Sequence, residues 1–280
     1  MNVSLDTNAL LDNPSSPAAR EPWLALSRVN MYDVGAVWRR HFEVYIRLWK
    51  MQLVAPLIEP IFMLFAFGWG IGSLIAAQVS GVSYLTFVGA GVLMFAPVSR
   101  AMFETTYAAY FRMVYQSTFD AILATPVEIE SLAFAEVIWA TTKSLIDAII
   151  IMLVLFAFGV TDSWFSIFAP LPILLASFLV AAIYLVVTAY VRDIDSYNLY
   201  IAIFFSLIFL CGIWFPIDVF PAPLRIAAWT IPLTSAIDLT RSMLTGTFRS
   251  VQILQLLYLL VSCFVFTEWS LRAMRRRMVV

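Results

Sequence analysis

Charged side chains stand inside long apolar stretches of this sequence, and their spacing limits the chemistry that they could do. Arg100 and Glu104 are four residues apart in one stretch, and Lys143 and Asp147 are four apart in another. Side chains four residues apart lie on one face of a helix, so we expect two ion pairs, each within a single helix. Glu59 lies close to two prolines and has no such partner. These charges could line a path for a polar solute or hold helices together, and the sequence leaves both interpretations open.

Aromatic side chains on two helical faces are a second group of candidates. Such faces could stack on sugar rings or slide along acyl chains, but we favour a belt of aromatics at a membrane interface. The faces are formed by Phe103, Tyr107 and Tyr110 and by Tyr197, Tyr200 and Phe204. The candidate translocation path therefore comprises Glu59, Arg100, Glu104, Tyr107, Lys143, Asp147, Tyr197, Tyr200 and Phe204.

Residue types that carry out covalent or metal chemistry are scarce. The sequence has one histidine, His41, and two cysteines, Cys211 and Cys263, both inside apolar runs. They form no metal-ligand cluster, no serine–histidine pair and no phosphate-binding loop. His41 lies on an amphipathic stretch and is expected to be an interfacial side chain. We therefore expect no catalysis and no metal or cofactor bound by this chain.

The elements that must position these residues are membrane-spanning helices. Hydrophobic residues make up 62% of the chain and charged residues 12%, whereas soluble domains carry about 25% charged residues. A spanning helix needs about 20 apolar residues, and lipid leaves backbone groups no other partner than the helix itself. We expect an all-α integral membrane protein with six spans, at residues 51–76, 84–111, 132–158, 164–190, 197–215 and 251–271.

The distribution of lysine and arginine predicts the orientation in the membrane. With six spans both termini share one side, and 12 of the 17 basic residues then fall on that side. Both termini are thus expected in the cytosol. A net charge of −1 argues against nucleic-acid binding. We divide the chain into a flexible cytosolic tail, residues 1–29, and one membrane unit, residues 30–280.

Residues 33–50 are expected to form an amphipathic helix before the first span. An apolar and aromatic face stands opposite a basic one, which is typical of a helix lying in the headgroup plane. The alternative is that this stretch is the frayed beginning of span one.

Residues 116–131 (QSTFDAILATPVEIES) interrupt the apolar pattern and are too short and too polar to cross a membrane. Phe119, Ile122 and Leu123 share one face of a short helix, with Asp120 turned away. We expect these three apolar side chains to form an exposed ridge for a soluble partner, since grooves in proteins commonly recognise helices in this way.

The second half of the same stretch predicts a new helix. Thr125 is expected at the N-cap, Pro126 at the first helical position and Glu128 as the third residue of a capping box. The result would be a stiff helical elbow that leads into span three.

Residues 214–248 are too apolar for an ordinary loop and contain too many prolines for a span. We expect one helix from Pro223 through Trp229 and a second over residues 233–244, stopped by Gly246. A helical hairpin that dips into the outer leaflet fits this pattern.

The order of these elements resembles the type-2 ABC exporter permeases. The likeness rests on TFDAILATPVEIESLAFAEVIWATTKS after two spans and CGIWFPIDVFPAPLRIAAWTIPLTSAIDLTRSMLTG before the last span, and it covers about residues 30–275. Within that family, the sequence most resembles the permeases that export nodulation factors, which are lipo-oligosaccharides. It resembles the permeases that export polysaccharides and drugs less strongly.

The resemblance implies a homodimer in the inner membrane of a bacterium, surrounded by lipid, with two separate ATP-binding subunits that carry ATP and Mg²⁺. It places the hairpin on the outer side of the path and leaves the substrate open among lipo-oligosaccharides, polysaccharides and drug-like molecules. It implies that the elbow couples to the ATPase, and the coupling residues would be Ser117, Phe119, Asp120, Ile122, Leu123, Thr125, Pro126 and Glu128.

The sequence leaves two other functional classes as alternatives to an export permease. An ion-coupled secondary transporter would use Glu59 and the Lys143–Asp147 pair, would work without ATP and would usually show internal repeats, which we do not find. An intramembrane enzyme would need clustered histidines or carboxylates at one depth, and a single histidine argues against it.

Overall fold

The computed structural model describes residues 24–72, 79, 81–161 and 163–279, and these ranges are helical apart from turns and one isolated bridge, Val79–Val82. The all-helical class expected from the sequence is confirmed. The α-helices are α1 Met31–Arg47, α2 Trp49–Leu64, α3 Tyr84–Phe103, α4 Thr118–Leu123, α5 Ile129–Ala157, α6 Pro170–Tyr190, α7 Tyr197–Leu210, α8 Ala222–Trp229, α9 Pro232–Thr245 and α10 Val251–Met278. The shorter 3₁₀ segments are η1 Ala25–Arg28, η6 Trp164–Phe168 and η7 Ile217–Val219, and the π-helical segments are η2 Phe65–Ile71, η4 Glu104–Ala108 and η5 Phe111–Tyr115.

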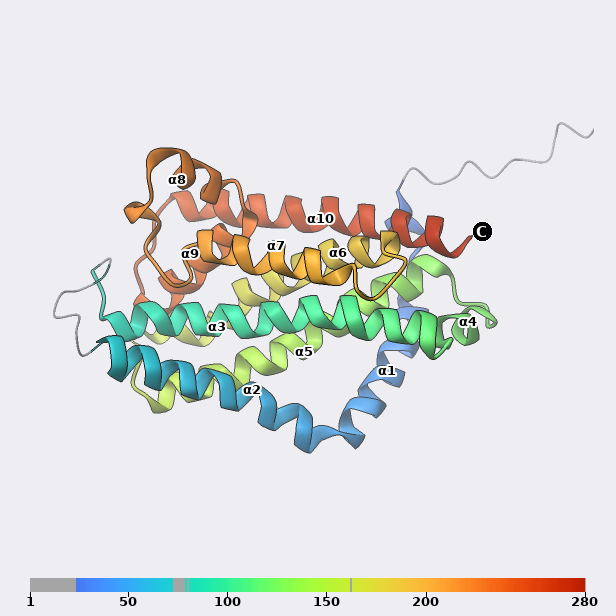
Figure 1. Cartoon of the computed structure of the whole chain (residues 1–280), viewed down its shortest axis with the longest axis horizontal. Coiled ribbons are helices and arrows are strands. Elements are labelled where there is room, and N and C mark those ends of the chain that lie inside the picture. Colours follow the sequence, from blue (N-terminus) through green and yellow to red (C-terminus); the bar gives the residue numbers. More distant parts are fainter. Residues whose placement is uncertain (1–23, 73–78, 80, 162, 280) are drawn as a thin grey trace, which may run out of the picture.

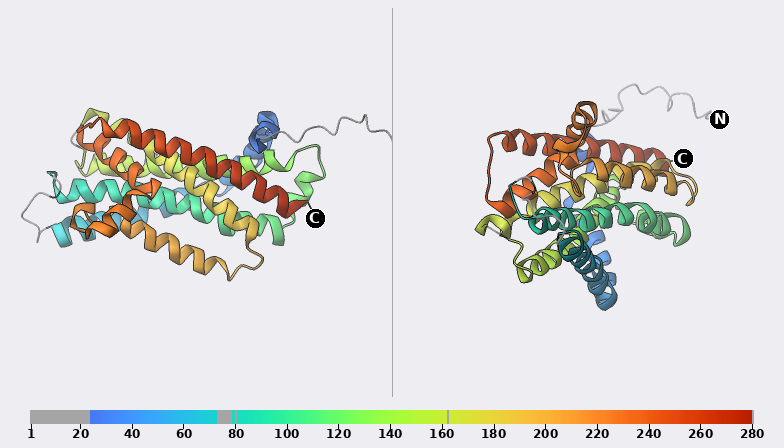
Figure 2. Two further views of the ribbon diagram at one scale, coloured as in Figure 1. Left: turned by 90° about the horizontal axis from the view of Figure 1, so that it is seen from above. Right: turned by 60° about the vertical axis from the view of Figure 1, so that its left-hand side comes forward.

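The long helices form an elongated bundle with α6 at its centre, in contact with α3, α5, α9 and α10. Figure 1 shows α4 at one end of this bundle and α8 at the other, and we call these the elbow end and the hairpin end. The helices α1 and α2 meet at an angle beside the bundle, at the foot of the same view. Two further views show the same elongated arrangement (Figure 2).

Among the described residues, five helical stretches are long and apolar enough to cross a membrane: Trp49–Gly68, Tyr84–Tyr115, Ile129–Ala157, Trp164–Tyr190 and Val251–Met278. They correspond to five of the six spans expected from the sequence. The remaining one is α7, an apolar helix of 14 residues. At 1.5 Å per residue α7 is about 21 Å long, short of the roughly 30 Å of hydrocarbon. The six-span topology therefore stays a prediction.

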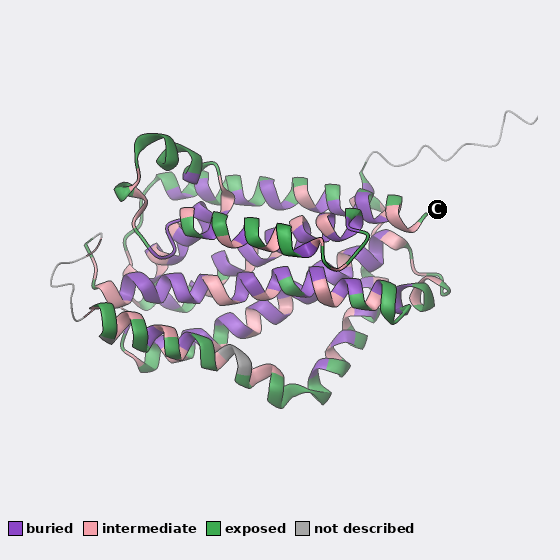
Figure 3. Ribbon diagram, in the orientation of Figure 1, coloured by how far each residue is buried: buried purple, intermediate pink, exposed green. Residues whose placement is uncertain are grey.

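The core is built from small and large apolar residues in different halves of the bundle. At the elbow end the buried cluster is rich in alanine, including Ala101, Ala133 and Ala182, whereas towards the hairpin end it contains Phe87, Leu93 and Leu179. Small residues let helix backbones approach closely, which is a common basis of helix association in membranes. Figure 3 shows burial concentrated on the inner helices and exposure along α2 and one side of α10. Those exposed faces are apolar and require lipid or another chain to cover them.

The amphipathic helix is confirmed as an element of its own. It ends at Arg47, and Leu48 breaks the helical path with φ −108° and ψ 15° before α2 begins. Its buried face packs on α5, where the indole Nε1 of Trp38 donates to the hydroxyl of Thr142 at 3.1 Å. The helix is therefore not the frayed start of the first span.

Residues 24–29, which belong to the expected tail, contact the bundle, and the division of the chain at residue 29 stays a prediction. The backbone N–H groups of Ala25 and Leu26 donate to the carboxylate of Glu268 on α10, at 2.6 and 3.1 Å. The first N–H groups of a helix have no partner within it, so Glu268 caps η1 and holds it on the bundle. The rest of the expected tail, residues 1–23, lies outside the described residues.

The expected helical elbow is present, but its capping box is not. Glu128 rather than Thr125 stands at the N-cap of α5, and its side chain makes no capping hydrogen bond. Thr125 remains in the turn that closes α4, because its N–H and its hydroxyl both donate to the carbonyl of Ile122. The new helix therefore starts at Ile129, three residues later than a cap at Thr125 would require.

The helical hairpin between α7 and α10 is confirmed. Helix α8 ends at Trp229, α9 starts at Pro232, and Gly246 stops α9 with φ +74°. A residue with a Cβ is strained in this left-handed conformation, which explains why glycine ends the helix. The turn after α7 is equally demanding, since Gly212 has φ +78°.

Candidate functional site: a buried ion-pair network and the cavity beside it

The four intramembrane charges are paired between helices, not within them. The guanidinium Nε of Arg100 on α3 contacts Oδ2 of Asp147 on α5 at 2.8 Å, and Nζ of Lys143 on α5 contacts Oε2 of Glu104 at 2.7 Å. The intrahelical pairs expected from the spacing of four are thus wrong. Because α3 and α5 pack together along these faces, each cation reaches the carboxylate on the opposite helix.

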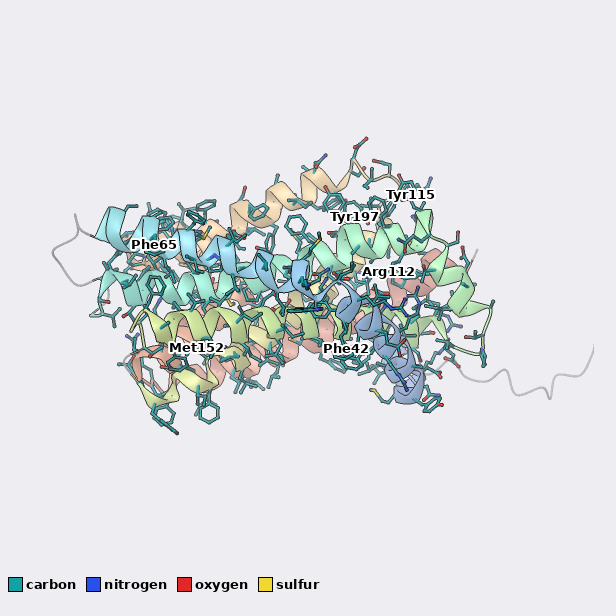
Figure 4. The ribbon with its side chains drawn as sticks, turned by 90° about the horizontal axis from the view of Figure 1, so that it is seen from below. Phe42, Phe65, Arg112, Tyr115, Met152 and Tyr197 are labelled. Carbon is teal, nitrogen blue, oxygen red and sulfur yellow. The ribbon has the colours of Figure 1, made fainter. Side chains whose placement is uncertain are left out.

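Arg112 extends the pairing towards the elbow end. Its Nη1 donates to Oε1 of Glu104 at 2.9 Å and its Nη2 donates to Glu136 on α5. Arg112 lies one residue beyond the expected second span, 84–111, in the continuous helical stretch Tyr84–Tyr115, and its side chain is largely buried. Figure 4 labels Arg112 on the α1 side of the bundle.

His41 brings α1 into the same arrangement. Its Nε2 lies 3.0 Å from Oε1 of Glu136, its ring stacks on Trp139, and it is 5% exposed. The expectation of an interfacial side chain is wrong. The signal was present in the spacing, because His41 continues the buried face formed by Val34, Val37 and Tyr45. A fully buried carboxylate requires partners, and Glu136 finds one on each side.

We call this set the ion-pair network. Its cations Arg100, Arg112 and Lys143 face as many carboxylates, Glu104, Glu136 and Asp147, and His41 is attached to it. Pairs as buried as these are neutral to mildly stabilising when intact, but removing one partner costs roughly 3–5 kcal/mol because the other charge stays buried. The network thus locks α1, α3 and α5 in one register.

The helix geometry changes where the network begins. After Phe103, α3 continues as π-helical segments starting at Glu104, and π-bulges frequently mark functional sites. The carbonyl of Thr105 in the first segment accepts a hydrogen bond from the hydroxyl of Thr188 at 2.6 Å, and Tyr197 in turn donates to Thr188 at 3.1 Å. Tyr197 therefore supports the π segment and is fully buried.

A cavity of about 520 Å³, which we call the α1-side cavity, opens beside the network between α1, the start of α2, α3 and α5. Four candidate path residues line it, namely Arg100, Glu104, Tyr107 and Lys143. Asp147 is not part of the cavity wall, but it contacts the wall residue Arg100. Polar groups that the sequence did not single out, Gln52 and Gln116, also lie on its wall.

Tyr45 also lines this cavity. Its ring lies 5.9 Å from Nζ of Lys143 and edge-on to Trp139. Its buried hydroxyl has no hydrogen-bond partner within the described part of the chain. Burial, reinforced by the charge of Asp147, raises the pKa of the Tyr45 phenol above its ordinary value, so the hydroxyl stays protonated and can donate.

The other candidate path residues do not join this cavity. Glu59 is exposed on α2, and Phe204 is buried against Tyr184. Tyr200 is half-buried, and its carbonyl accepts a hydrogen bond from Tyr184. The structure thus brings together the charged candidates of α3 and α5 with Tyr107. The ring of Tyr107 in turn contacts Tyr197 of α7, with 5.4 Å between ring centroids, whereas Glu59, Tyr200 and Phe204 lie outside this cavity.

The elbow presents a different surface from the one expected. Phe119 is fully buried in the core at the elbow end, while Ile122 and Leu123 are half-buried. The prediction that Phe119, Ile122 and Leu123 form an exposed ridge is therefore wrong, because the six-residue helix α4 directs Phe119 into its own bundle. The residues that remain exposed there are Ser117, Asp120, Ala121, Ala124, Thr125, Pro126 and Glu128.

The chain enters α4 through a strained residue. Ser117 has φ +47°, and it is the only residue other than glycine with positive φ within the described ranges. Such a conformation costs of order 1–3 kcal/mol and persists only where the surroundings impose it. It turns the chain sharply from the end of α3 into α4 and thereby directs Phe119 inwards.

Comparison with known proteins shows that one family model spans the ion-pair network, the elbow and the hairpin. A family model described as ABC-2 type transporter matches residues 32–245. Nodulation protein J of Rhizobium leguminosarum bv. trifolii is 35% identical over 213 residues, 75% of this chain and 80% of that protein. Nodulation protein J of Bradyrhizobium diazoefficiens is 33% identical over 76% of this chain and 81% of that protein. Nodulation protein J of Rhizobium meliloti is 30% identical over 80% of this chain and 86% of that protein. The family match includes α1, the ion-pair network, the elbow and both hairpin helices.

Proposed function

The chain belongs to the ABC-2 type transporter family, and we propose on this premise that it is the permease of an ATP-driven exporter. It would act as a homodimer in a bacterial inner membrane, with both termini in the cytosol and two ATP-binding subunits docked on the elbow end. ATP and Mg²⁺ would be held by those subunits, and this chain would bind neither. The substrate would be a lipid-linked or amphipathic molecule, such as a lipo-oligosaccharide, a polysaccharide or a drug-like compound.

The observation that carries this proposal is the connection between the elbow and the ion-pair network. Helix α4 lies at the end of the bundle with Asp120 exposed, and Phe119 on its opposite side is buried in the core. The chain leaves α4 through a short turn and enters α5, which carries Glu136, Lys143 and Asp147. A displacement of α4 therefore reaches α3 and α1 through charged contacts.

A second set of contacts holds the same end of the bundle together. Glu130, in the first turn of α5, contacts Arg28 of η1 at 3.5 Å and Arg275 of α10 at 2.5 Å. Because the start of α5 is fixed to two other segments, movement of the elbow is passed along α5 rather than lost in a loop. This arrangement supports a coupling role for residues 117–128.

The α1-side cavity supports an entry point for an amphipathic substrate. It lies next to the exposed apolar surface of α2 and is lined by charged and amide side chains. A polar head could occupy the cavity while an acyl chain stays in lipid. The carboxylates of the network all hold cations, which argues against the ion-coupled transporter considered above, since a proton relay needs carboxylates free to take up a proton.

Association with an ATP-binding subunit tests the proposal. We expect the tagged chain, purified from its native membrane in mild detergent, to retain a polypeptide with ATPase activity, and Asp120→Arg to reduce that activity at least tenfold by reversing a charge on the exposed face of α4. Asp195→Arg is the matched control, because Asp195 is also exposed and lies in the loop between α6 and α7. Equal recovery of ATPase activity with both variants would refute docking at the elbow.

A further inference from the structure

The charges that line the α1-side cavity are mainly positive. Four lysine and arginine side chains stand on its wall, namely Arg40, Arg100, Arg112 and Lys143. Among the described residues, Glu104 is the only carboxylate on this wall. Asp147 and Glu136 are paired with Arg100 and Arg112, but neither of these carboxylates lines the cavity. The ion-pair network is neutral as a whole, and yet its cations lie closer to the cavity than two of its anions.

The exposure of the paired side chains agrees with this arrangement. The side chains of Arg100, Arg112 and Lys143 are 26%, 13% and 10% exposed, whereas those of their carboxylate partners are between 0% and 6% exposed. Arginine carries five N–H donors and lysine three, so a cation held by a carboxylate can still donate to a second anion. A hollow lined by one sign of charge concentrates the opposite sign, and this wall therefore attracts anions.

Arg40 adds a positive charge that no carboxylate balances. It is exposed on α1 and forms no ion pair with another described residue, whereas its neighbour Arg39 is paired with Glu43 at 3.1 Å. The amides of Gln52 and Gln116 stand on the same wall and can donate to further oxygen atoms. Guanidinium and amide donors together suit an anion with several oxygen atoms, and a phosphate group is such an anion.

The entrance of the cavity is apolar and continues onto α2. The wall residues Val44, Leu48 and Phe111 are 51%, 52% and 45% exposed, and beyond them Met51 and Val54 of α2 are 80% and 52% exposed. Figure 3 shows this exposure continuing along α2. A ligand that fits both the basic wall and this surface carries a phosphate at one end and long apolar chains at the other.

We propose that the α1-side cavity binds one anionic phospholipid of the surrounding membrane, with its headgroup against the basic wall and its acyl chains along α2. Basic pockets between membrane helices are typical sites for such headgroups. The volume of about 520 Å³ lies within the roughly 300–1,000 Å³ of small-molecule sites. The lipid bridges α1, α2 and α3 and thereby supports the angle between α1 and α2. Its binding needs no ATP-binding subunit, and only one consequence rests on the proposed function, namely that a substrate entering here displaces the lipid.

The test uses the full-length chain, purified in non-ionic detergent without any ATP-binding subunit, and native mass spectrometry to count the bound lipids. Dioleoylphosphatidylglycerol should show one site with roughly tenfold higher affinity than dioleoylphosphatidylcholine, which has the same chains and no net charge. Glycerol phosphate, which has the phosphate without acyl chains, should not displace the lipid at millimolar concentration. Displacement at the concentration where the lipid itself binds would assign the site to soluble phosphates and refute the proposal.

Two matched pairs of variants locate the lipid in the cavity. Arg40→Gln removes the unbalanced charge and should weaken phosphatidylglycerol binding about fivefold, whereas Arg39→Gln removes the same charge beside it but off the wall and should not. Val44→Trp narrows the entrance without changing any charge and should also weaken binding. Its control is Val261→Trp, because Val261 is 52% exposed on α10 and lies off the wall.

Three results would overturn this proposal. They are equal affinity for the two phospholipids, equal loss of affinity in Arg40→Gln and Arg39→Gln, and equal loss in Val44→Trp and Val261→Trp. The four substituted residues are exposed, so all four variants are expected to fold. Failure of the ATPase association experiment would leave these lipid measurements unchanged, so the proposed function and the lipid site are tested independently.

Discussion

Replacing Arg100 and Asp147, separately and together, tests the pairing between α3 and α5. Asp147 is 5% exposed and Arg100 is 26% exposed at the side chain. Arg100→Met strands a buried carboxylate, so its cost falls within the 3–5 kcal/mol expected for breaking a buried pair, about 4 kcal/mol. Asp147→Leu leaves a guanidinium that reaches the α1-side cavity, so we discount its cost to about 2 kcal/mol.

The double variant measures the coupling energy between Arg100 and Asp147. If the two effects were independent, Arg100→Met/Asp147→Leu would cost about 6 kcal/mol, but removing both charges leaves no stranded partner. We expect about 1 kcal/mol, because an intact buried pair contributes little net stability, and hence a coupling energy of about 5 kcal/mol. At roughly 2–4 °C per kcal/mol, the double variant should unfold about 10–20 °C above the temperature expected from additivity.

The assay is reversible unfolding of the purified chain in detergent micelles, followed by tryptophan fluorescence. The matched control is Lys143→Met/Asp147→Leu, which removes the pair that the spacing of four would suggest. Lys143 contacts Glu104 instead, so we expect coupling below about 1 kcal/mol in this control. Larger coupling between Lys143 and Asp147 than between Arg100 and Asp147 would refute the interhelical pairing.

Two further predictions concern the elbow and the topology. Phe119→Asp should lower the yield of folded protein, because it places a charge in the core, whereas Asp120→Arg should fold normally. Size-exclusion profiles of the two variants distinguish these outcomes. A monodisperse Phe119→Asp permease would contradict the burial of this side chain. Asp195 and Thr247 are both exposed and lie at opposite ends of the bundle. Single cysteines at these positions should therefore react with a membrane-impermeant maleimide from opposite sides of the membrane. We expect labelling of Thr247→Cys in intact cells and of Asp195→Cys only after the cytosolic face is opened. Labelling of both positions from one side would contradict the expected orientation.

The elements of this protein could be predicted from local features of the sequence. Apolar length marks the spans, and proline and glycine mark the ends of α8 and α9, because both effects act within a few residues. The short polar stretch around Asp120 likewise had to leave the bundle. The capping box was misplaced because Thr125 can close one helix as well as start the next, and only the packing of α4 decides between them.

The contacts between elements depend on the tertiary structure. A spacing of four shows that Arg100 and Glu104 share a face, but it does not show which helix that face meets, and the packing of α3 on α5 exchanges the partners. His41 and Phe119 are buried for the same reason, because each lies on the face of its helix that packs against the bundle. Helix faces follow from the period of the chain, whereas partners follow from how whole helices pack, and in a buried setting every charge must find its counterpart across that contact.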